Sequence, residues 1–307
     1  MTTSPGSRVV LRYRLPAGAS HPMTDVIGIL DRDDDVVVVV SERGERVQVT
    51  RDQVVALKEL TTRPIRTSEI RALEHAAADG WPGLEQEWID GWILKAGNGF
   101  TGRANSATPL SPEAGDRSLE TIRAWYGARG LEPRLLLPDR LGTVPAGWQA
   151  GPDVLVMAAD VTDFVPPQSP PVDVGVSPDE QWLGAYHYHG EPVPDTGLPV
   201  LQAVRQGTVG FIRLGETTTT LAVTRAAVTT APDGRRWVGL TAVEVAAAHR
   251  RRGLGTLVCA AAVEWGRERG ATHAYLQVES SNEAAVTMYR GLGFVDHHRY
   301  RYVVPLG

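Results

Sequence analysis

The sequence predicts an α/β (α+β) protein in three parts: a small β-barrel, a middle region of helices and strands, and a C-terminal domain that repeats this order more clearly. Short β-branched runs separated by turns fill residues 8–60, and strand and helix patterns alternate in both regions after them. A proline-rich junction lies at residues 164–178. The predicted parts are residues 1–61, 62–168 and 169–307.

The first part consists of short strand-like runs between turns. The runs are "RVVLRYRL", "TDVIGIL", "VVVVVS", "RVQVT" and "VVALKEL", and their regular spacing predicts an SH3-like small β-barrel, which we interpret as a partner-binding module. The acidic stretch "DRDDD" is predicted to be a solvated hairpin turn. It does not fit a calcium loop, because the spaced oxygen ligands and terminal glutamate of such a loop do not follow.

The middle part mixes helices and strands. "TSEIRALEHAAADGW" and "SLETIRAWYGARG" have helical periodicity, whereas "EWIDGWILKAG", "PRLLLP" and "DVLVMAADV" predict strands. "GNGFTG", with Gly97, Gly99 and Gly102, matches the G-x-G-x-x-G fingerprint of dinucleotide-binding sites. The continuation "RANSATPL" is not an amphipathic helix, so a hairpin turn is favoured over a Rossmann site.

Composition restricts the functional classes. The chain has 307 residues, a net charge of -5 and one cysteine, Cys259, in an apolar helical stretch where a core position is expected. The negative charge argues against direct nucleic-acid binding. The single cysteine excludes an internal disulfide and fits a reducing compartment. With no export signal and no apolar run long enough for a bilayer, we expect a cytoplasmic protein without a membrane partner.

In the third part, a strand-like run leads into "RRRGLG" at residues 250–255, and a helix follows. The N-terminus of a helix offers unpaired N–H groups, glycines let an anion approach the backbone, and arginines pair with phosphate oxygens. The loop therefore predicts an anion cradle, with a pyrophosphate as the favoured ligand. It lacks the GxxxxGK[ST] spacing of a P-loop. The alternative is an arginine-rich solvated turn.

A second motif follows in "LQVESSNEAAVTMYRGLGF". It predicts a strand, a capping box of Ser280 with Glu283, and a short helix that ends near Gly291. Asn282 and Tyr289 are seven residues apart, which is nearly two helical turns, so both can face the same side of that helix. This side can line a cleft.

These residues carry a resemblance to the GNAT superfamily of N-acetyltransferases. "RRRGLG" matches its R/Q-x-x-G-x-G/A acetyl-coenzyme A (acetyl-CoA) signature, and N-x-x-A-x-x-x-Y-x-x-x-G-F, from Asn282 to Phe294, is similar to its second motif. The resemblance covers residues 172–307 directly and implies the GNAT fold with a mixed central sheet. The middle part resembles a degenerate copy in a tandem GNAT protein. The whole arrangement resembles a bacterial group described as histone-acetyltransferase-like.

The resemblance implies that acetyl-CoA is the co-substrate and that no metal is required. Backbone N–H groups of residues 251–256 would hold the pyrophosphate, while the strand before the loop would align the pantetheine arm and supply an N–H group to the oxyanion. The implied cofactor-binding residues are Val243, Val245, Arg250, Arg251, Arg252, Gly253, Leu254, Gly255, Thr256 and Asn282.

Tyr289 matches the family's general-acid position; the alternative is an aromatic residue that only packs before a glycine cap. The general base is less defined, because the positions that carry Glu or His in many relatives correspond here to about Gly239 and Thr241. Glu244 is the predicted base, although strand alternation places it opposite Val243 and Val245 unless a bulge intervenes.

Glu279, at the end of the next strand, is a second candidate for the base. The segment at residues 182–194 corresponds to the acceptor loop of the superfamily, and the resemblance implies that Trp182, Tyr186 and Tyr188 line the substrate pocket. The nearby histidines and the pair His297 and His298 lack zinc-ligand spacing, so we expect solvent-facing or hydrogen-bonded histidines there.

The leading hypothesis is an acetyl-CoA-dependent N-acetyltransferase that acts by direct attack of a primary amine in a ternary complex. The acceptor is a small molecule or a protein lysine, such as that of a histone-like protein. The alternative is a catalytically weak CoA-binding or acetyl-CoA-binding sensor or scaffold whose barrel recruits a partner. A barrel that binds nucleic acid is disfavoured, since it lacks an aromatic and basic face.

Overall fold

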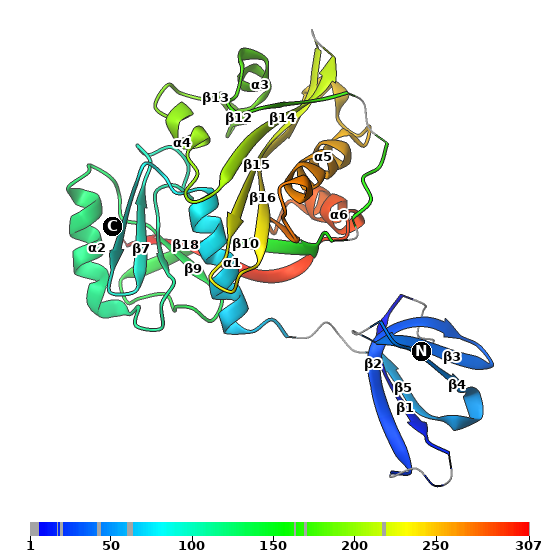
Figure 1. Ribbon diagram of the computed structural model, residues 1–307. Helices are drawn as coiled ribbons and strands as arrows, with labels where there is room; N and C mark the ends of the chain where they lie inside the picture. The colour runs from blue at the N-terminus through cyan, green and yellow to red at the C-terminus, as the bar shows by residue number, and fades with distance from the viewer. Residues whose placement is uncertain are drawn as a thin grey trace. The chain divides into compact units, whose positions relative to one another are not determined.

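The computed structural model describes residues 6–16, 18, 21–41, 44–59, 64–162, 164–168, 171–216 and 219–306. The chain folds into two compact units, Met1–Pro64 and Ile65–Gly307 (Figure 1). Because the second unit is compact throughout, the division of the chain at residue 168 stays a prediction.

The described residues of the first unit form a five-stranded antiparallel sheet in the order β4-β3-β2-β1-β5. Alternate apolar side chains, such as Leu11, Leu30 and Val39, make its core. A 3₁₀ turn, η1 (Arg51–Gln53), precedes the last strand. The strands are β1 (Arg8–Arg14), β2 (Met23–Asp33), β3 (Val36–Ser41), β4 (Arg46–Thr50) and β5 (Val54–Glu59).

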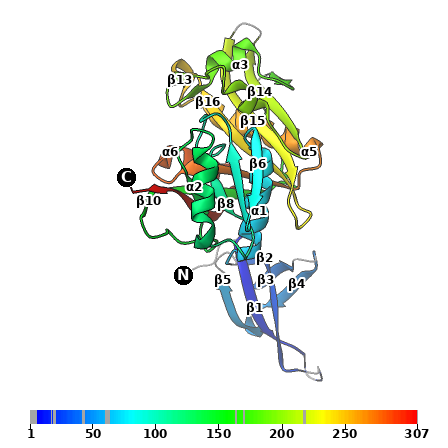
Figure 2. The ribbon, with the colours of Figure 1, turned by 90° about the vertical axis from the view of Figure 1, so that its left-hand side faces the viewer.

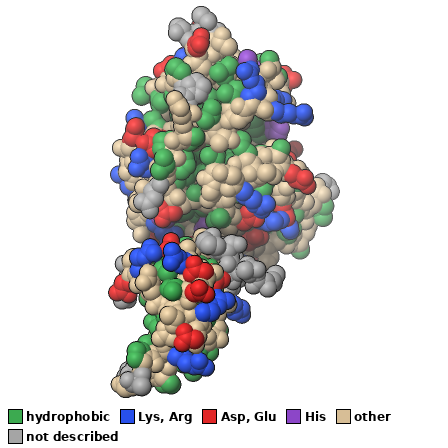
Figure 3. All heavy atoms as spheres, turned by 90° about the vertical axis from the view of Figure 1, so that its right-hand side faces the viewer, with side chains coloured by type: hydrophobic (Ala, Val, Ile, Leu, Met, Phe, Trp, Pro, Cys, Tyr) green, Lys and Arg blue, Asp and Glu red, His purple; other side chains and the backbone are tan. Residues whose placement is uncertain are grey.

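Charges of both signs alternate on the surface of this unit (Figure 3). Arg12 pairs with Asp25 and Arg46 pairs with Asp31, each at 2.7 Å between nitrogen and oxygen. The "DRDDD" stretch ends β2 and turns into β3, which confirms the predicted hairpin. Within the described part of the unit, ion pairs of this kind balance the positive charge of arginine side chains with carboxylates.

The second unit is built on an 11-stranded mixed sheet in the order β11-β14-β15-β16-β17-β10-β18-β9-β8-β7-β6, counted over the described residues. Two pairs, β16 with β17 and β8 with β9, are parallel, and the other pairs are antiparallel. The strands are β6 (Glu85–Ile89), β7 (Trp92–Ala96), β8 (Ala107–Pro109), β9 (Leu135–Pro138), β10 (Trp148–Asp160), β11 (Val172–Gly175), β14 (Thr208–Glu216), β15 (Thr219–Thr230), β16 (Arg236–Val245), β17 (His273–Glu279) and β18 (Val295–Pro305).

The helices cover both faces of this sheet. A small hairpin, β12 (His187–Tyr188) with β13 (Glu191–Pro192), follows α3, and the 3₁₀ turns η2 (Asp116–Ser118) and η3 (Ala247–His249) precede α2 and α5. No helix in the described part of the chain is both long and apolar enough to cross a membrane. The helices are α1 (Thr67–Gly80), α2 (Leu119–Gly127), α3 (Glu180–Ala185), α4 (Leu198–Gln202), α5 (Leu254–Glu268) and α6 (Glu283–Gly291).

One face packs against α5 and α6, and the other against α1 (Figure 1). On α5, apolar residues such as Val258 and Ala262 recur at helical spacing and enter the core with Cys259. Burial raises the pKa of the Cys259 thiol to about 12, so this cysteine is an unreactive core residue, as expected.

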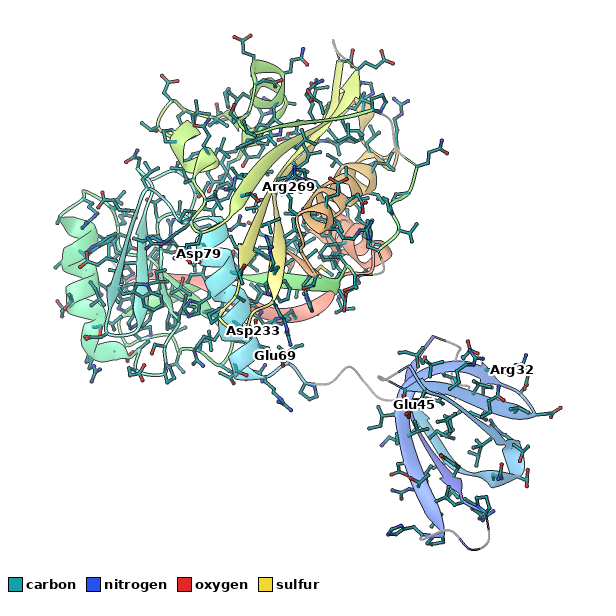
Figure 4. All side chains as sticks on the ribbon, in the orientation of Figure 1. Arg32, Glu45, Glu69, Asp79, Asp233 and Arg269 are labelled. Atoms are coloured by element: carbon teal, nitrogen blue, oxygen red, sulfur yellow. The ribbon has the colours of Figure 1, made fainter. Side chains whose placement is uncertain are left out.

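The start of α1 is tied to the turn between β15 and β16 (Figure 4). Arg235 lies between Glu69 and Asp233, with nitrogen-to-oxygen distances of 3.5 and 3.6 Å. At the other end of the sheet, α2 packs on β7, β8 and β9 through residues such as Ile122 and Trp125 (Figure 2). The middle and C-terminal parts of the chain thus share one sheet.

The two parts also follow the same strand order. Three antiparallel strands, a helix and a parallel strand occur as β6-β7-β8-α2-β9 and again as β14-β15-β16-α5-β17. The "GNGFTG" stretch connects β7 to β8, which are antiparallel, so the predicted hairpin turn is confirmed. The long strand β10 is inserted between β17 and β18 and joins the two parts.

Candidate active site

The parallel strands β16 and β17 separate at their carboxyl ends. They pair as far as Leu240 and Leu276, whereas β16 continues to Val245 and β17 continues to Glu279. β17 stays paired with β10 along this stretch. The edge of β16 beyond Leu240 therefore faces an opening between the strands, where its backbone groups can hydrogen-bond a ligand.

A β-bulge in β16 lies at the point of separation. Between Thr241 and Glu244 the pairing with β15 shifts register, and Ala242 adopts a φ of 52°. A bulge places two residues opposite one and re-aims the side chains that follow. Beyond the bulge, Val243 and Val245 pack beside the core under α5 and Glu244 is directed at His187, and atoms of all three residues line the cleft.

The opening is part of a cleft of about 850 Å³. Its walls come from β16, the loop before α5, the start of α5, the end of β17 and α6. The structure brings most of the predicted site residues together here. Those that line the cleft are Tyr186, Tyr188, Val243, Glu244, Val245, Arg250, Arg251, Gly253, Leu254, Gly255, Thr256, Asn282 and Tyr289.

The loop before α5 has the backbone of an anion cradle. Arg251 and Gly253 adopt φ values of 61° and 75°, and no side chain caps the first turn of the helix. The N–H of Leu257 donates to the carbonyl of Gly253 at 3.2 Å, so the amides before Leu257 are outside the helical ladder. These N–H groups and the positive end of the helix dipole suit a phosphate.

The three arginines of the loop have different positions. Arg250 Nε donates to the carbonyl of Val245 at 3.2 Å, which holds this side chain beside the cleft. Arg252 does not line the cleft, because its Nη1 lies 2.9 Å from His249 Nδ1 on the exposed side of the loop. The predicted contact of Arg252 with the cofactor, through its backbone N–H group, stays a prediction.

Glu244 connects the arginine loop to the acceptor loop. Its Oε2 accepts a hydrogen bond from the N–H of His187 at 2.8 Å. Its Oε1 lies 3.7 Å from His187 Nδ1 and 3.8 Å from Arg250 Nη2. The carboxylate is thus fixed at the rim between the two ends of the cleft.

Helix α6 approaches α5 closely at a glycine. A Cβ atom at Gly255 would lie 2.7 Å from Sδ of Met288, so any larger residue would displace the Met288 side chain. The N-cap of α6 is Asn282, whose Oδ1 accepts from the N–H of Ala285 at 3.2 Å; the predicted cap was Ser280. This packing brings Asn282 to the wall of the cleft.

Tyr289 is held in the same wall by α6. It is 7% exposed, and its ring centroid lies 6.2 Å from that of Phe294. Burial, with a smaller contribution from Cys259, raises the pKa of the Tyr289 phenol well above its ordinary value. The phenol is therefore protonated at neutral pH and can donate a proton into the cleft.

The acceptor end of the cleft is lined by Tyr186 and Tyr188, on either side of His187. Trp182 does not reach it. This side chain is 1% exposed, and its indole N–H is directed at the carbonyls of Ile212 and Thr224, at 3.2 and 3.3 Å. The prediction that Trp182 binds substrate is wrong, because α3 turns the indole into the core against the sheet.

The positions that carry Glu or His in many relatives are filled differently here. A Cβ atom at Gly239 would lie 2.3 Å from the ring of Tyr275, which occupies that space. Thr241 is buried, and its hydroxyl donates to the carbonyl of Arg225 at 3.3 Å. Glu244 and Glu279 are the carboxylates that line the cleft within the described residues.

His189 of the acceptor segment also lines the cleft. Two further residues of the cleft were not predicted from the sequence: Arg103, from the loop after β7, and Gln277, on β17. The signal for Arg103 was the "GNGFTGRANS" stretch, which was interpreted only as a turn. Among the described residues, no group of three or more His, Cys, Asp or Glu side chains is arranged to hold a metal ion.

Comparison with known families gives two matches. A model described as probable histone acetyltransferase Rv0428c C-terminal matches residues 67–303, and one described as Rv0428c N-terminal Sm-like domain matches residues 3–58. The SH3-like assignment of the barrel is therefore not confirmed, since the matching description is Sm-like.

Relatives and solved structures agree with this result. The chain is 42% identical over 301 residues to the probable histone acetyltransferase Rv0428c of Mycobacterium tuberculosis, covering 97% of this chain and 94% of that protein. It is 28% identical over 262 residues to the uncharacterized N-acetyltransferase YobR of Bacillus subtilis, covering 76% and 98%. The fold is similar to a GCN5-related N-acetyltransferase from Kribbella flavida, with a TM-score of 0.55, 22% identity and coverage of 78% and 95%. The chain therefore belongs to the family of the probable histone acetyltransferase Rv0428c and is a GNAT-type N-acetyltransferase.

Proposed function

We propose that the chain transfers an acetyl group from acetyl-CoA to a primary amine by direct attack in a ternary complex. The observation that carries the proposal is the composition of one cleft. An uncapped helix start with two arginines, an unpaired strand edge and a buried protonated tyrosine all line it. These are the groups that bind a pyrophosphate, align an extended pantetheine arm and protonate a thiolate.

In this proposal the cofactor lies along β16 and the start of α5. Backbone N–H groups of residues 251–256 hold the pyrophosphate, and Arg250 and Arg251 pair with its oxygens. The edge of β16 at Val243 and Val245 hydrogen-bonds the pantetheine arm, and Asn282 contacts it from α6. Arg252 contributes its backbone N–H, since its side chain is directed at His249.

The reaction requires a neutral amine. Its nitrogen attacks the carbonyl carbon of the thioester, a C–N bond forms, and a backbone N–H of β16 stabilises the oxyanion. The C–S bond then breaks, and the thiolate of CoA takes the proton of the Tyr289 phenol. We assign the base that accepts the amine proton to Glu244, either directly or through a water, with Glu279 as the other carboxylate within the cleft.

The acceptor is a primary amine of either of two kinds. The name of the relative from Mycobacterium tuberculosis suggests a protein lysine on a histone-like protein. A small-molecule amine is the other kind, and the shape of the acceptor end of the cleft bears on this choice below.

The test is release of free thiol from acetyl-CoA by the full chain with a panel of primary amines. We expect turnover that depends on both substrates and falls about 100-fold in Tyr289→Phe, which removes the proton donor and keeps the ring.

A second candidate is a CoA-binding or acetyl-CoA-binding sensor, which the non-ionisable residues at Gly239 and Thr241 favour. It predicts tight binding of acetyl-CoA without multiple turnover for any amine in the panel. Absence of acetyl-CoA binding would contradict both candidates.

A further inference from the structure

The "GNGFTGRANS" loop between β7 and β8 has no role in the chemistry described above, yet it is tightly organised. Asn105 is 4% exposed, and its Oδ1 accepts from the N–H groups of Gly97 and Gly99 at 2.8 and 3.1 Å. Its Nδ2 donates to the carbonyls of Phe100 and Thr101 at 2.9 and 2.8 Å. One buried amide thus makes four hydrogen bonds and fixes the loop.

The same loop contains strained backbone. Asn98 and Thr101 are not glycines, yet they adopt φ values of 53° and 62°. The hydroxyl oxygen of Thr101 accepts from the indole N–H of Trp81 at 3.1 Å, which anchors the loop to the end of α1. Strain of this kind persists where surrounding contacts over-determine a conformation, and it is concentrated at functional sites. The residue that this loop presents is Arg103.

Arg103 lines a cavity of about 230 Å³ that continues the acceptor end of the cofactor cleft. The cavity and the cleft share Arg103, Tyr188, Gln277 and Glu279 in their walls. Its lining also includes aromatic rings, among them those of Tyr300 and Tyr302 on β18. A ligand in this cavity would therefore reach the end of the cofactor cleft at Gln277.

Two buried polar atoms in the walls of this cavity have no hydrogen-bond partner: Nε of Arg103 and Oε1 of Gln277. Buried donors and acceptors in proteins are nearly always paired. Both side chains line the cavity, so they can offer a donor and an acceptor to a ligand with an acceptor at one end and a donor at the other. Gln277 directly follows the last β17 residue paired with β16, so it lies where the strands separate.

A second arginine beside Trp81 has its donors paired, whereas Nε of Arg71 and Nε of Arg213, outside this cavity, are also unpaired. Arg225 and Arg103 both lie over the Trp81 ring, with guanidinium carbons 4.5 and 5.5 Å from its centroid. Arg225 Nε and Nη2 donate to the carbonyls of Leu201 and Ala203 at 2.6 and 2.7 Å. Arg225 is thus held by the fold, whereas Arg103 keeps a donor for a ligand.

We propose that the acceptor is a small amine that also carries a carboxylate, with Arg103 binding the carboxylate and Gln277 Oε1 accepting from the amine. This inference rests on the proposed acetyl transfer and narrows its acceptor. A guanidinium pairs geometrically with a carboxylate. A single cation beside Glu279 suits a monoanion better than a phosphate dianion. The side chain of a protein lysine has no anionic group to satisfy Arg103.

The test compares matched acceptors with and without the carboxylate, in the full chain with saturating acetyl-CoA. The pairs are L-lysine with cadaverine and L-phenylalanine with phenethylamine, and the readout is kcat and KM from thiol release. We expect a lower KM for the carboxylated member of a pair. Arg103→Gln should raise that KM about 10- to 100-fold and leave the KM of its partner and the affinity for acetyl-CoA unchanged.

Three further variants keep the test specific. Arg103→Lys retains the charge without the planar fork and should fall between the wild type and Arg103→Gln. Arg134→Gln is the matched control: its guanidinium carbon lies 5.7 Å from the Tyr302 ring, but it does not line the cavity, so both KM values should be unchanged. Gln277→Leu should raise the KM of both members of a pair, because both carry the amine.

The outcomes separate this inference from the proposed function. Equal KM values within each pair, or an Arg103→Gln variant that affects both members equally, would overturn the role of Arg103. Faster transfer to the lysine of an N-acetylated, C-amidated peptide would overturn the acceptor class and leave acetyl transfer intact. Acetyl-CoA binding without transfer to any carboxylated amine would also overturn it. Failure of the wild type to bind acetyl-CoA would remove both proposals.

Discussion

The second unit contains two crossovers with the same topology and different chemistry. β8-α2-β9 and β16-α5-β17 each connect two parallel strands through a helix. The loop before α5 carries Arg250 and Arg251 at an uncapped helix start. The corresponding entrance to α2 passes through η2 and carries Asp116, Arg117 and Glu120, which are of mixed charge. Its two carboxylates offset its arginine, whereas the entrance to α5 attracts a pyrophosphate with two arginines.

The interiors differ as well. In the C-terminal crossover the strands separate at the bulge near Ala242 and leave a cleft. In the middle crossover Trp125 and Tyr126 of α2 pack against the strands, and the Tyr126 hydroxyl donates to the carbonyl of Lys95 at 3.0 Å. The same topology therefore does not by itself make a cofactor site. A cofactor site also requires an unpaired strand edge, a helix start that can bind an anion, and small residues between the two.

We expect the largest effect on acetyl-CoA affinity from a variant that removes the difference between the entrances to α5 and α2. In a Gly253→Asp, Gly255→Asp double variant, two carboxylates occupy the anion cradle, and the Cβ at position 255 meets Met288 Sδ at 2.7 Å. We expect the affinity for acetyl-CoA to fall about 1,000-fold, because like charges are brought together without solvent. Isothermal titration at fixed ionic strength measures this, with circular dichroism to verify folding.

The matched control is Gly115→Asp at the entrance to α2. Gly115 has an extended backbone with φ of -158°, and the nearest atom to its Cβ would be the carbonyl oxygen of Glu113 at 3.9 Å. This variant should bind acetyl-CoA as the wild type does. Equal losses in the two variants would show that the entrances do not differ in the way described.

The second effect concerns the two buried tyrosines. Tyr289→Phe should lower kcat about 100-fold with unchanged affinity for acetyl-CoA, whereas Tyr126→Phe should keep kcat and lower the free energy of unfolding by about 1 kcal/mol. Because burial raises the pKa of Tyr289, its phenol stays protonated at and above pH 10, so kcat should not decline through loss of this acid near that pH. Steady-state kinetics across the alkaline range measure both; a Tyr289→Phe variant with normal kcat would contradict the role.

The third effect concerns the pH dependence of stability, through a histidine on β18, the strand between β10 and β9. Burial, with smaller contributions led by His298, lowers the pKa of His297 to about 3. Folded His297 is neutral and the unfolded chain binds a proton below about pH 6.5. Stability is therefore present above pH 6.5 and is lost as the pH falls toward 3, by at most about 1.4 kcal/mol per pH unit from this group.

His297→Gln should flatten this slope by about 1 kcal/mol between pH 6 and pH 5, where carboxylates still contribute little. Urea unfolding at several pH values gives the free energies of unfolding. If the wild type and the variant lose stability in parallel over this window, then His297 is not buried in its neutral form at the junction.

The smallest effect separates the arginines of the loop. Arg252→Gln should weaken acetyl-CoA binding less than about threefold, since its side chain is exposed and directed at His249. Arg250→Gln should weaken it about tenfold, because this guanidinium lines the cleft. Titration at two salt concentrations checks the order, and an Arg252→Gln variant weaker than Arg250→Gln would reverse the assignment.

The parts of the site that could be predicted from the sequence lie in short motifs whose residues have fixed spacings. Gly253, Gly255, Asn282 and Tyr289 have fixed spacings around a strand, a loop and a helix, so the sequence indicated them together. The placement of β10 between β17 and β18 could not be predicted, because strand neighbours far apart in the chain depend on tertiary packing.

Three side chains show why the rest could not be predicted. Glu244 reaches the cleft through a bulge at Ala242, and nothing in "LTAVEV" marks a bulge. Trp182 lies in a segment rich in aromatic residues, where composition does not tell which ring faces the core. Arg103 is distant in sequence from both motifs, and only the shared sheet brings it to the acceptor end of the cleft.

Isothermal titration of acetyl-CoA into the full chain gives the binding stoichiometry and so decides between one cofactor site and two. We expect one acetyl-CoA per chain, bound at the C-terminal crossover and lost in the Gly253→Asp, Gly255→Asp variant. Two acetyl-CoA molecules per chain, or one that survives in this variant, would show that the middle crossover also binds the cofactor and would contradict the distinction drawn between them.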